Sequence, residues 1–245
     1  MTEPTYLLVC PGPSAKEYIQ EAFDACGNNR RVASCNGGVL VMREYLPYTN
    51  PDIYMVIEQP AVMEYYKDMR QAALAGKDVW TWPSRTGECH GFQHKVRALK
   101  IPKAGDKQAR EARKKNIYLP GFCTHATTVG VTLLTWLVDH YKAKNIHVVG
   151  MDSYDIDELY DSLVDYAPVS PPTVEHCVNL NELGGQFLEQ VMQHKANSGV
   201  QFTFYGPARH RTPKWRCKFV EHTDELESRL PDEWEPLSTY DKKDE

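Results

Sequence analysis

Apolar residues in this chain fall into short continuous runs that alternate with stretches of helical spacing. The clearest example is the segment 127–152. Its helical part contains five apolar residues at helical intervals: Val131, Leu134, Leu137, Val138 and Tyr141. A β-branched run at 146–149 follows and stops at Gly150, as a buried parallel strand does. This segment is therefore predicted to form one helix followed by one parallel strand.

The same alternation continues along the rest of the chain. Further strands are predicted at 6–10, 31–35, 53–57, 78–82, 117–119 and 201–205, and helices at 15–26, from about 60 to 75, and at 181–197. Strands that alternate with helices favour a parallel sheet. We therefore expect an α/β fold, a Rossmann-like mostly parallel sheet with flanking helices.

Two segments interrupt this pattern. Residues 83–116 are expected to form an insertion that becomes rich in Lys and Arg and is helical near 106–115. Residues 153–175 are acidic, contain three tyrosines and end near several prolines, and they are too long for a plain connection, so they are predicted to form a lid. The domain prediction is one Rossmann-like domain over 1–220 and an acidic C-terminal tail over 221–245.

The composition is that of an ordinary globular protein. The chain has 245 residues, of which 42% are hydrophobic and 25% charged. No apolar run is long enough to span a bilayer, and the N-terminus lacks the basic region of a signal peptide. Seven cysteines without paired spacing favour a reducing compartment, so we expect a cytoplasmic protein. The sequence contains neither CxxC nor HExxH, so neither a structural zinc site nor a zincin is indicated, and no metal site is predicted.

Charge is distributed unevenly. Residues 95–116 contain nine Lys or Arg and two acids, a net +7, although the whole chain has a net charge of −5. Such a run is usually a solvated helix face, but its contrast with the rest of the chain favours a polyanionic partner. A second basic run contains Trp215, and aromatic residues among bases are typical of nucleic-acid sites. The candidate nucleic-acid contacts are Lys107, Arg110, Arg113, Lys114, Arg209 and Arg211.

Glycines and polar residues follow the predicted strands at the points where a ligand would bind. In open α/β sheets, ligands lie outside the carboxyl ends of strands, and helix starts bind phosphate. The expected ligand contacts are Gly12, Pro13, Ser14, Asn36, Gly37, Thr127, Thr128 and Gly130, with Asp152 at the end of the strand 146–149. Each also has a structural interpretation, as a turn, a helix cap or a carboxylate bound by backbone. Since G-x-G-x-x-G is absent, a dinucleotide site is not indicated.

Three motifs in order resemble a known superfamily. They are Gly12-Pro13-Ser14 after the first strand, Asn36 after the second, and Thr128-Val129-Gly130 on a helix that leads to Gly150-Met151-Asp152. The superfamily contains the bacterial sialyltransferases of glycosyltransferase family 42 and the archaeal 6-hydroxymethylpterin diphosphokinase-like proteins (domain of unknown function 115). The similarity spans roughly residues 5–60 and 124–205.

The first loop departs from the usual G-N-G-P-S-L of that group. Cys10-Pro11 replaces Gly-Asn, and Ala15 replaces Leu. The asparagine of the family touches the nucleotide and Pro11 cannot replace it, so the resemblance does not imply a cytidine donor.

The resemblance implies a nucleotide-sugar-dependent glycosyltransferase with no obligatory cofactor. It places the general base at His176, which follows the lid, although His176 is one of nine histidines. A neutral imidazole suits the removal of a proton from an attacking hydroxyl. Asp152 is the second catalytic candidate, and the lid tyrosines Tyr154, Tyr160 and Tyr166 are candidates for contact with the leaving phosphate.

The acceptor is the least constrained part of this prediction. The basic segments favour a polyanionic acceptor, and a cytoplasmic enzyme with such segments could modify a hydroxymethylated pyrimidine in DNA, as viral sugar-adding enzymes do; a viral protein would then act in the host cytoplasm. One alternative is a Mg²⁺-dependent diphosphokinase that acts on a small hydroxymethyl compound, with the metal held by Asp152 and Asp155. Another is a non-catalytic nucleotide-binding protein.

Overall fold

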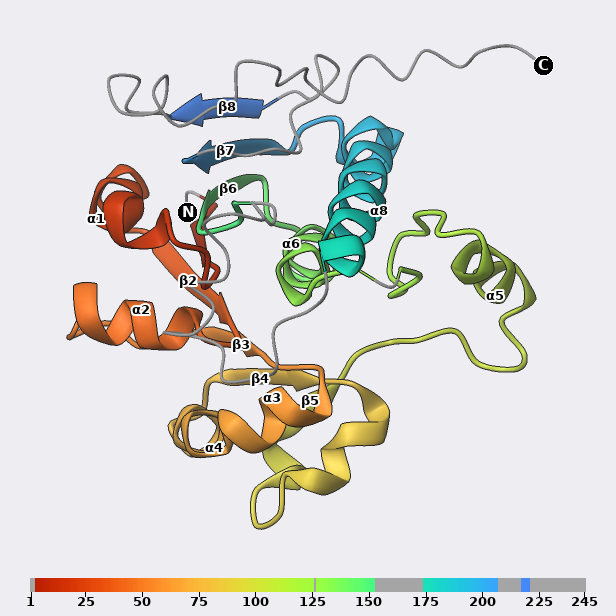
Figure 1. Cartoon of the computed structure of the whole chain (residues 1–245), viewed down its shortest axis with the longest axis horizontal. Coiled ribbons are helices and arrows are strands. Elements are labelled where there is room, and N and C mark those ends of the chain that lie inside the picture. Colours follow the sequence, from red (N-terminus) through yellow and green to blue (C-terminus); the bar gives the residue numbers. More distant parts are fainter. Residues whose placement is uncertain (1–2, 126, 153–173, 207–216, 221–245) are drawn as a thin grey trace.

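The computed structural model describes residues 3–125, 127–152, 174–206 and 217–220. Within these ranges eight strands form one sheet in the order β5-β4-β3-β2-β1-β6-β7-β8, and every neighbouring pair is parallel (Figure 1). The strands are β1 (Thr5–Val9), β2 (Arg30–Cys35), β3 (Ile53–Met55), β4 (Asp78–Thr81), β5 (Val96–Ala98), β6 (Asn145–Val149), β7 (Gln201–Tyr205) and β8 (Cys217–Val220). The expected α/β, Rossmann-like fold is confirmed.

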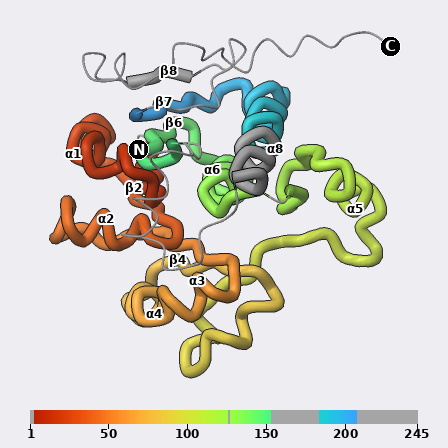
Figure 2. The backbone as a smooth tube through the Cα atoms, viewed as in Figure 1, coloured from red at the N-terminus to blue at the C-terminus, as the bar shows by residue number. Residues whose placement is uncertain are grey.

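Helices cover both faces of this sheet. They are α1 (Ala15–Ala25), α2 (Gly38–Tyr45), α3 (Gln59–Glu64), α4 (Tyr66–Leu74), α5 (Lys107–Lys114), α6 (Val129–Asp139) and α8 (Val174–Gln193), with short 3-10 turns η1 (Pro83–Glu88), η2 (Gln93–Lys95) and η3 (Lys195–Asn197). Figures 1 and 2 show α1 and α2 on one side of the sheet and α6 and α8 on the other. The layers are those of a doubly wound fold.

The pleat of the strands explains the two-sided core. Leu7 and Val9 of β1 pack with α1 and α2, whereas Tyr6 and Leu8 pack with α6 and α8. Successive side chains of a strand point to opposite faces, so a strand covered on both faces needs a continuous apolar run. That is why the runs in the sequence locate these strands well.

The strand order creates one position where the chain changes direction across the sheet. From β1 the chain proceeds outwards through β2 to β5, and then returns to β6 on the other side of β1. The carboxyl ends of β1 and β6 are therefore a topological switch point, the place where open α/β sheets bind ligands. The loops after these strands contain Gly12–Ser14 and Gly150–Asp152.

The structure differs from the sequence predictions in the middle of the chain. The predicted strand at 117–119 is wrong, because side chains satisfy its backbone: Tyr118 N–H donates to Gln190 Oε1 at 3.0 Å, and Thr124 Oγ1 donates to the Ile117 carbonyl at 2.7 Å. The segment 83–116 contains the predicted helix, α5, but it also contributes β5, which pairs with β4 at the sheet edge.

The C-terminal predictions also need correction at their boundaries. The helix expected from residue 181 begins at Val174, and β8 extends the sheet with a strand that was not predicted. Several predicted contacts lie outside the described residues: Tyr154, Tyr160 and Tyr166 of the lid, Arg209, Arg211, and the tail 221–245. No helix in the described part of the chain is long and apolar enough to cross a membrane.

Candidate functional site

The loops that follow β1 and β6 are bonded to one another at the switch point. Cys10 N–H donates to the Val149 carbonyl, and Gly12 N–H donates to the Gly150 carbonyl, both at 2.9 Å. Gly150 has a left-handed φ of 68°, and a Cβ at this position would lie 2.2 Å from the Cys10 carbonyl oxygen. A glycine is therefore required for the two loops to approach this closely.

Ser14 and Asp152 link the same two loops through side chains. Ser14 N–H donates to Asp152 Oδ2 at 2.7 Å, and Ser14 Oγ donates to Asp152 Oδ1. Both residues are buried, with 6% and 9% of their surfaces exposed. The carboxylate also lies at the start of α1, where the helix dipole favours a negative charge. Asp152, a predicted catalytic residue, is thus a fixed acceptor that positions the first loop.

The backbone N–H groups of the first loop all donate within the chain. Cys10, Gly12 and Ser14 donate as described, and Ala15 N–H donates to the Gly12 carbonyl at 3.0 Å. The prolines at 11 and 13 have no N–H to offer. The loop lies where the sequence predicted it, but its N–H groups are not available to a phosphate while these bonds persist. Contact between a ligand and other atoms of Gly12, Pro13 and Ser14 stays a prediction.

The start of α6 has backbone donors without a hydrogen-bond partner within the described ranges, and it lies beside these loops. Of the two threonines that could cap this helix, Thr127 and Thr128, the N-cap is Thr128, and its Oγ1 accepts from Val131 N–H at 3.4 Å. The first i→i−4 bond is the one from Thr132 to Thr128, at 3.1 Å, so the N–H groups of Val129 and Gly130 precede the helical ladder. A Cβ at Gly130 would lie 3.0 Å from Cys10 Sγ and 3.3 Å from Met151 Cε. The helix start therefore contacts both strand-end loops.

Asn36 stands at the end of β2 in an unusual backbone conformation. Its φ is 42°, its N–H donates to the Met55 carbonyl at 3.2 Å, and its carbonyl accepts from Tyr54 Oη at 2.9 Å. Gly37 and α2 follow directly, and a Cβ at Gly38 would lie 2.4 Å from the Val9 carbonyl oxygen. Asn36 is thus held between the carboxyl ends of β1 and β3, with the first turn of α2 after it.

Two predicted contacts carry buried polar atoms without partners. Asn36 Oδ1 and Thr127 Oγ1 are both buried, and neither has a hydrogen-bond partner among the described residues. Buried polar atoms are nearly always paired, so each exception needs a physical reason such as a bound polar group. These two atoms lie at the end of β2 and just before α6, on the two sides of the switch-point loops.

His125 is a further candidate that the sequence prediction missed. Its Nε2 lies 3.1 Å from Thr132 Oγ1, and Thr132 Oγ1 donates its hydrogen to the Thr128 carbonyl at 3.0 Å. His125 Nε2 must therefore carry the ring hydrogen, and Nδ1 is a buried acceptor without a described partner. Burial and the nearby Arg113 charge lower the pKa of His125 to about 3, so the ring is neutral. Its only sequence signal is its position two residues before the threonine-rich helix start.

The departure from the family motif has a structural consequence at Cys10. The Cys10 and Cys35 thiols lie 3.7 Å apart at the ends of β1 and β2, and both are buried. The hydrogen bond with Cys35 and burial raise the pKa of Cys10 well above its usual value. Since the thiolate is the reactive form of cysteine, Cys10 acts here as a packing residue under Gly130.

His176 lies in the first turn of α8. The sequence placed it before the last helix, so the helix boundary is different, but its position in the fold is compatible with the site. A helix that connects parallel strands runs against them, and α8 leads into β7, so its first turn lies toward the carboxyl edge of the sheet. The predicted nucleic-acid contacts of the first basic segment lie on α5, away from the switch point (Figure 1): Lys107, Arg110, Arg113 and Lys114.

Comparisons of the chain with protein-family models, with curated proteins and with solved structures found no match. The resemblance therefore depends on the three motifs and their order, which the fold brings together at one edge of the sheet. Within the described ranges, no group of three or more His, Cys, Asp or Glu side chains is placed to hold a metal ion.

Proposed function

We propose that this protein is a nucleotide-sugar-dependent glycosyltransferase whose donor binds at the carboxyl ends of β1, β2 and β6. The observation that supports this most directly is a pair of buried atoms at the switch point of a Rossmann-like sheet, Asn36 Oδ1 and Thr127 Oγ1, which have no partner in the described part of the chain. The three motifs in order support a member of the superfamily that the sequence resembles, and His176 at the start of α8, where the glycosyltransferases of that superfamily have their general base, favours sugar transfer within it.

The residues at the switch point suit different parts of the donor. The N–H groups of Val129 and Gly130 bind the donor phosphates, because a helix start combines free N–H donors with the positive end of the helix dipole. Asn36 binds the nucleoside. The bond between Ser14 and Asp152 fixes the loops against which the donor lies.

The reaction is a direct displacement at the anomeric carbon of the sugar. The acceptor hydroxyl loses its proton to His176 and forms the new C–O bond, while the bond from the sugar to the nucleotide phosphate breaks and the phosphate departs with the electron pair. The protein contributes by holding the two substrates in line and by stabilising the departing phosphate at the start of α6. No obligatory metal or other cofactor is part of this proposal.

The acceptor in this proposal is a hydroxymethylated pyrimidine in DNA, the substrate of a viral DNA-modifying enzyme. The cationic helix α5 supports a polyanionic acceptor, since most of the affinity of a protein for nucleic acid comes from its contacts with phosphates.

A thermal-shift screen tests donor binding. A matching nucleotide or nucleotide sugar at one hundred times its dissociation constant is expected to stabilise the fold by about 2.7 kcal/mol. Stabilisation by a pterin or ATP only with Mg²⁺ would favour the diphosphokinase alternative, and nucleotide binding with no turnover of any nucleotide sugar would favour a non-catalytic protein. The proposal fails if no nucleotide, with or without a sugar, shifts the transition.

The Asn36→Ala and Thr128→Ala variants test the donor contacts. Each is expected to weaken donor binding by roughly 1–2 kcal/mol, the effect of one lost polar contact, measured by isothermal titration calorimetry. Asn116→Ala is the matched control for Asn36, because Asn116 also has a left-handed φ, 52° against 42°, but lies after α5. Thr128→Ser keeps the capping oxygen and should bind normally. Unchanged donor affinity in both alanine variants would remove these residues from the site.

A further inference from the structure

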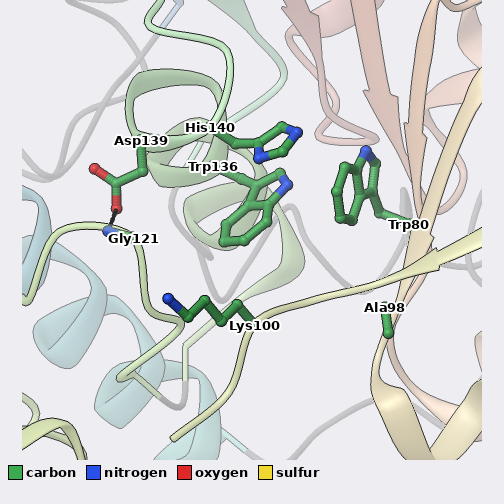
Figure 3. Close-up of a pocket in the computed structure, with 7 residues that line it drawn as sticks. All are labelled: Trp80, Ala98, Lys100, Gly121, Trp136, Asp139 and His140. Carbon is green, nitrogen blue, oxygen red and sulfur yellow. Dashed lines mark hydrogen bonds between the residues drawn. The ribbon is translucent and has the colours of Figure 1, made fainter.

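A pocket lies on the sheet face that α6 covers. Its volume is about 370 Å³, within the range of ligand sites (Figure 3). Its lining comes from β4, the end of β5, the loop before α6 and the last turn of α6: Trp80, Ala98, Lys100, Gly121, Trp136, Asp139 and His140. From Val129 to Asp139 the helix rises about 15 Å, so this pocket and the donor site lie at opposite ends of α6.

The pocket has a rigid aromatic wall. The rings of Trp80 and Trp136 meet edge to face with centroids 5.2 Å apart, and His140 stacks on Trp136 with an interplanar angle of 4°. Trp80 Nε1 donates to Tyr141 Oη, which donates to Asp78 Oδ2, both at 2.8 Å. Burial and Arg97 lower the pKa of His140, which favours its neutral, stacking form. The aromatic groups are thus fixed before any ligand arrives.

The opposite wall is held by a buried polar network. Asp139 accepts hydrogen bonds from Tyr118 Oη and, at 3.0 Å, from Gly121 N–H, the bond drawn in Figure 3. Asn197 Nδ2 donates to Tyr118 Oη at 3.0 Å. Because both carboxylate oxygens are occupied, Asp139 shapes the pocket and leaves the recognition of a ligand to the aromatic rings and the cations.

Cations lie at the mouth of the pocket and continue beyond it. Lys100 is exposed, with its Nζ 4.1 Å from the centre of the Phe122 ring. Two residues further along the chain, Pro102 begins a second hollow of about 410 Å³, which it shares with Arg110, Arg113 and Lys114 of α5. The Arg113 guanidinium lies 5.8 Å from the Trp82 ring. An aromatic pocket is therefore followed by a basic hollow.

The basic hollow retains most of its positive charge. The one acid of α5, Glu111, pairs with Lys114 at 2.9 Å. Lys107, Arg110 and Arg113 form no salt bridge with any residue in the described ranges. These three side chains are exposed, so they are available to a polyanion.

We propose that the pocket at Trp80, Trp136 and His140 binds an unstacked base of a single-stranded nucleic acid, and that the α5 cations bind the neighbouring phosphates. Aromatic stacking beside a positively charged groove is how proteins bind single strands, with about 1–3 kcal/mol for each stacked base. This inference gives the proposed acceptor a binding site. Binding of the strand is independent of the proposed function, and the transfer of a sugar to that strand rests on it. The distance of about 15 Å to the donor site corresponds to a few nucleotides, since a strand advances 3.4 Å or more per phosphate.

The test is fluorescence anisotropy of a labelled oligothymidylate with the full chain over a range of salt concentrations and without donor. Substitution of Lys107, Arg110 and Arg113 by Gln should flatten the plot of log affinity against log salt by about 0.7 for each lost phosphate contact. A control that removes two positive charges elsewhere is Lys67→Gln with Arg70→Gln on α4, at the other face of the sheet, which should leave the slope nearly unchanged.

Two variants test the pocket itself and keep both buried tryptophans. Ala98→Leu fills the exposed mouth, and His140→Ala removes one ring; each should weaken oligothymidylate binding by about fivefold or more, the equivalent of at least about 1 kcal/mol of stacking. Ala75→Leu, at the exposed end of α4, is the control for added volume. Circular dichroism melts verify that each variant is folded.

The outcomes distinguish a single strand from a duplex and from a free mononucleotide. Oligothymidylate binding that both the pocket and the α5 variants weaken supports the proposal. It is overturned if the chain binds no oligonucleotide, if a duplex binds as well as the single strand and the pocket variants have no effect, or if thymidine monophosphate binds as tightly as the oligonucleotide. Because donor is absent, these results are independent of the thermal-shift screen, and failure of the donor site leaves them interpretable.

Discussion

The Gly150→Ala variant is expected to lose about 2–5 kcal/mol of the free energy of unfolding. An alanine in the left-handed conformation observed here, φ 68°, costs about 1–2 kcal/mol. Its Cβ would also lie 2.2 Å from the Cys10 carbonyl oxygen and 2.8 Å from Ala15 Cβ, and overpacking of this kind typically costs about 1–3 kcal/mol. Urea denaturation of the purified variant measures the sum.

Gly27→Ala separates the two contributions. Gly27 has nearly the same φ, 66°, but a Cβ there would meet nothing within 4 Å, so this variant should lose only the conformational part, about 1–2 kcal/mol. The difference between the two variants measures how closely the loops after β1 and β6 approach. Equal losses would mean that the close approach, and with it the arrangement of the candidate donor site, is wrong.

The parts of the fold that the sequence predicted are those with a local signal. β1, β6 and β7 are buried on both faces, which requires runs of apolar residues that are visible without a structure. Thr128 was recognisable as a cap because a threonine before an apolar helix is itself the signal. The strand ends then located the switch point, since parallel strands end at the same edge.

The parts that were missed depend on contacts between distant segments. β5 has three residues, and only Val96 is buried, so an edge strand inside a basic segment leaves no apolar run. The bond between Ser14 and Asp152 joins positions 138 residues apart. His125 Nδ1, which has no partner among the residues that the structure describes, is left as an acceptor by a hydrogen-bond chain through Thr132 and Thr128 that no periodicity reveals.

The aromatic pocket shows the same limit. Trp80, Lys100 and Trp136 come from a strand, a connection and a helix that are separate in sequence. The sequence indicated the basic segment but gave no reason to place Trp80 or Trp136 beside it. Trp215, which suggested a stacking residue from the sequence, lies outside the described residues.

The structure favours His176 over Asp152 as the general base. A general base needs a free lone pair within reach of the acceptor hydroxyl. Asp152 is buried, and Ser14 donates to both of its oxygens, so proton transfer to Asp152 would disrupt the bonds that hold the first loop. His176, in the first turn of α8, is therefore the better candidate for the base.

The His176→Ala variant is expected to lose about 10²–10⁴ in turnover, the usual effect of removing a general base, with donor affinity unchanged. Single-turnover measurements with a radiolabelled nucleotide sugar give the rate, and calorimetry gives the dissociation constant of the donor. The acid limb of the pH–rate profile should vanish in this variant. An exposed histidine far from the switch point, His90, is the control, and His90→Ala should retain both properties.

Asp152→Asn distinguishes a base from a residue that positions the loop. Because the amide keeps one acceptor oxygen for Ser14 and loses the charge at the start of α1, this variant should lower the free energy of unfolding together with turnover, whereas His176→Ala should lower turnover alone. Near-normal turnover in His176→Ala would exclude it as the base. If Asp152→Asn then abolishes an activity that requires Mg²⁺, the protein is a diphosphokinase, and its metal is held by carboxylates that include Asp152.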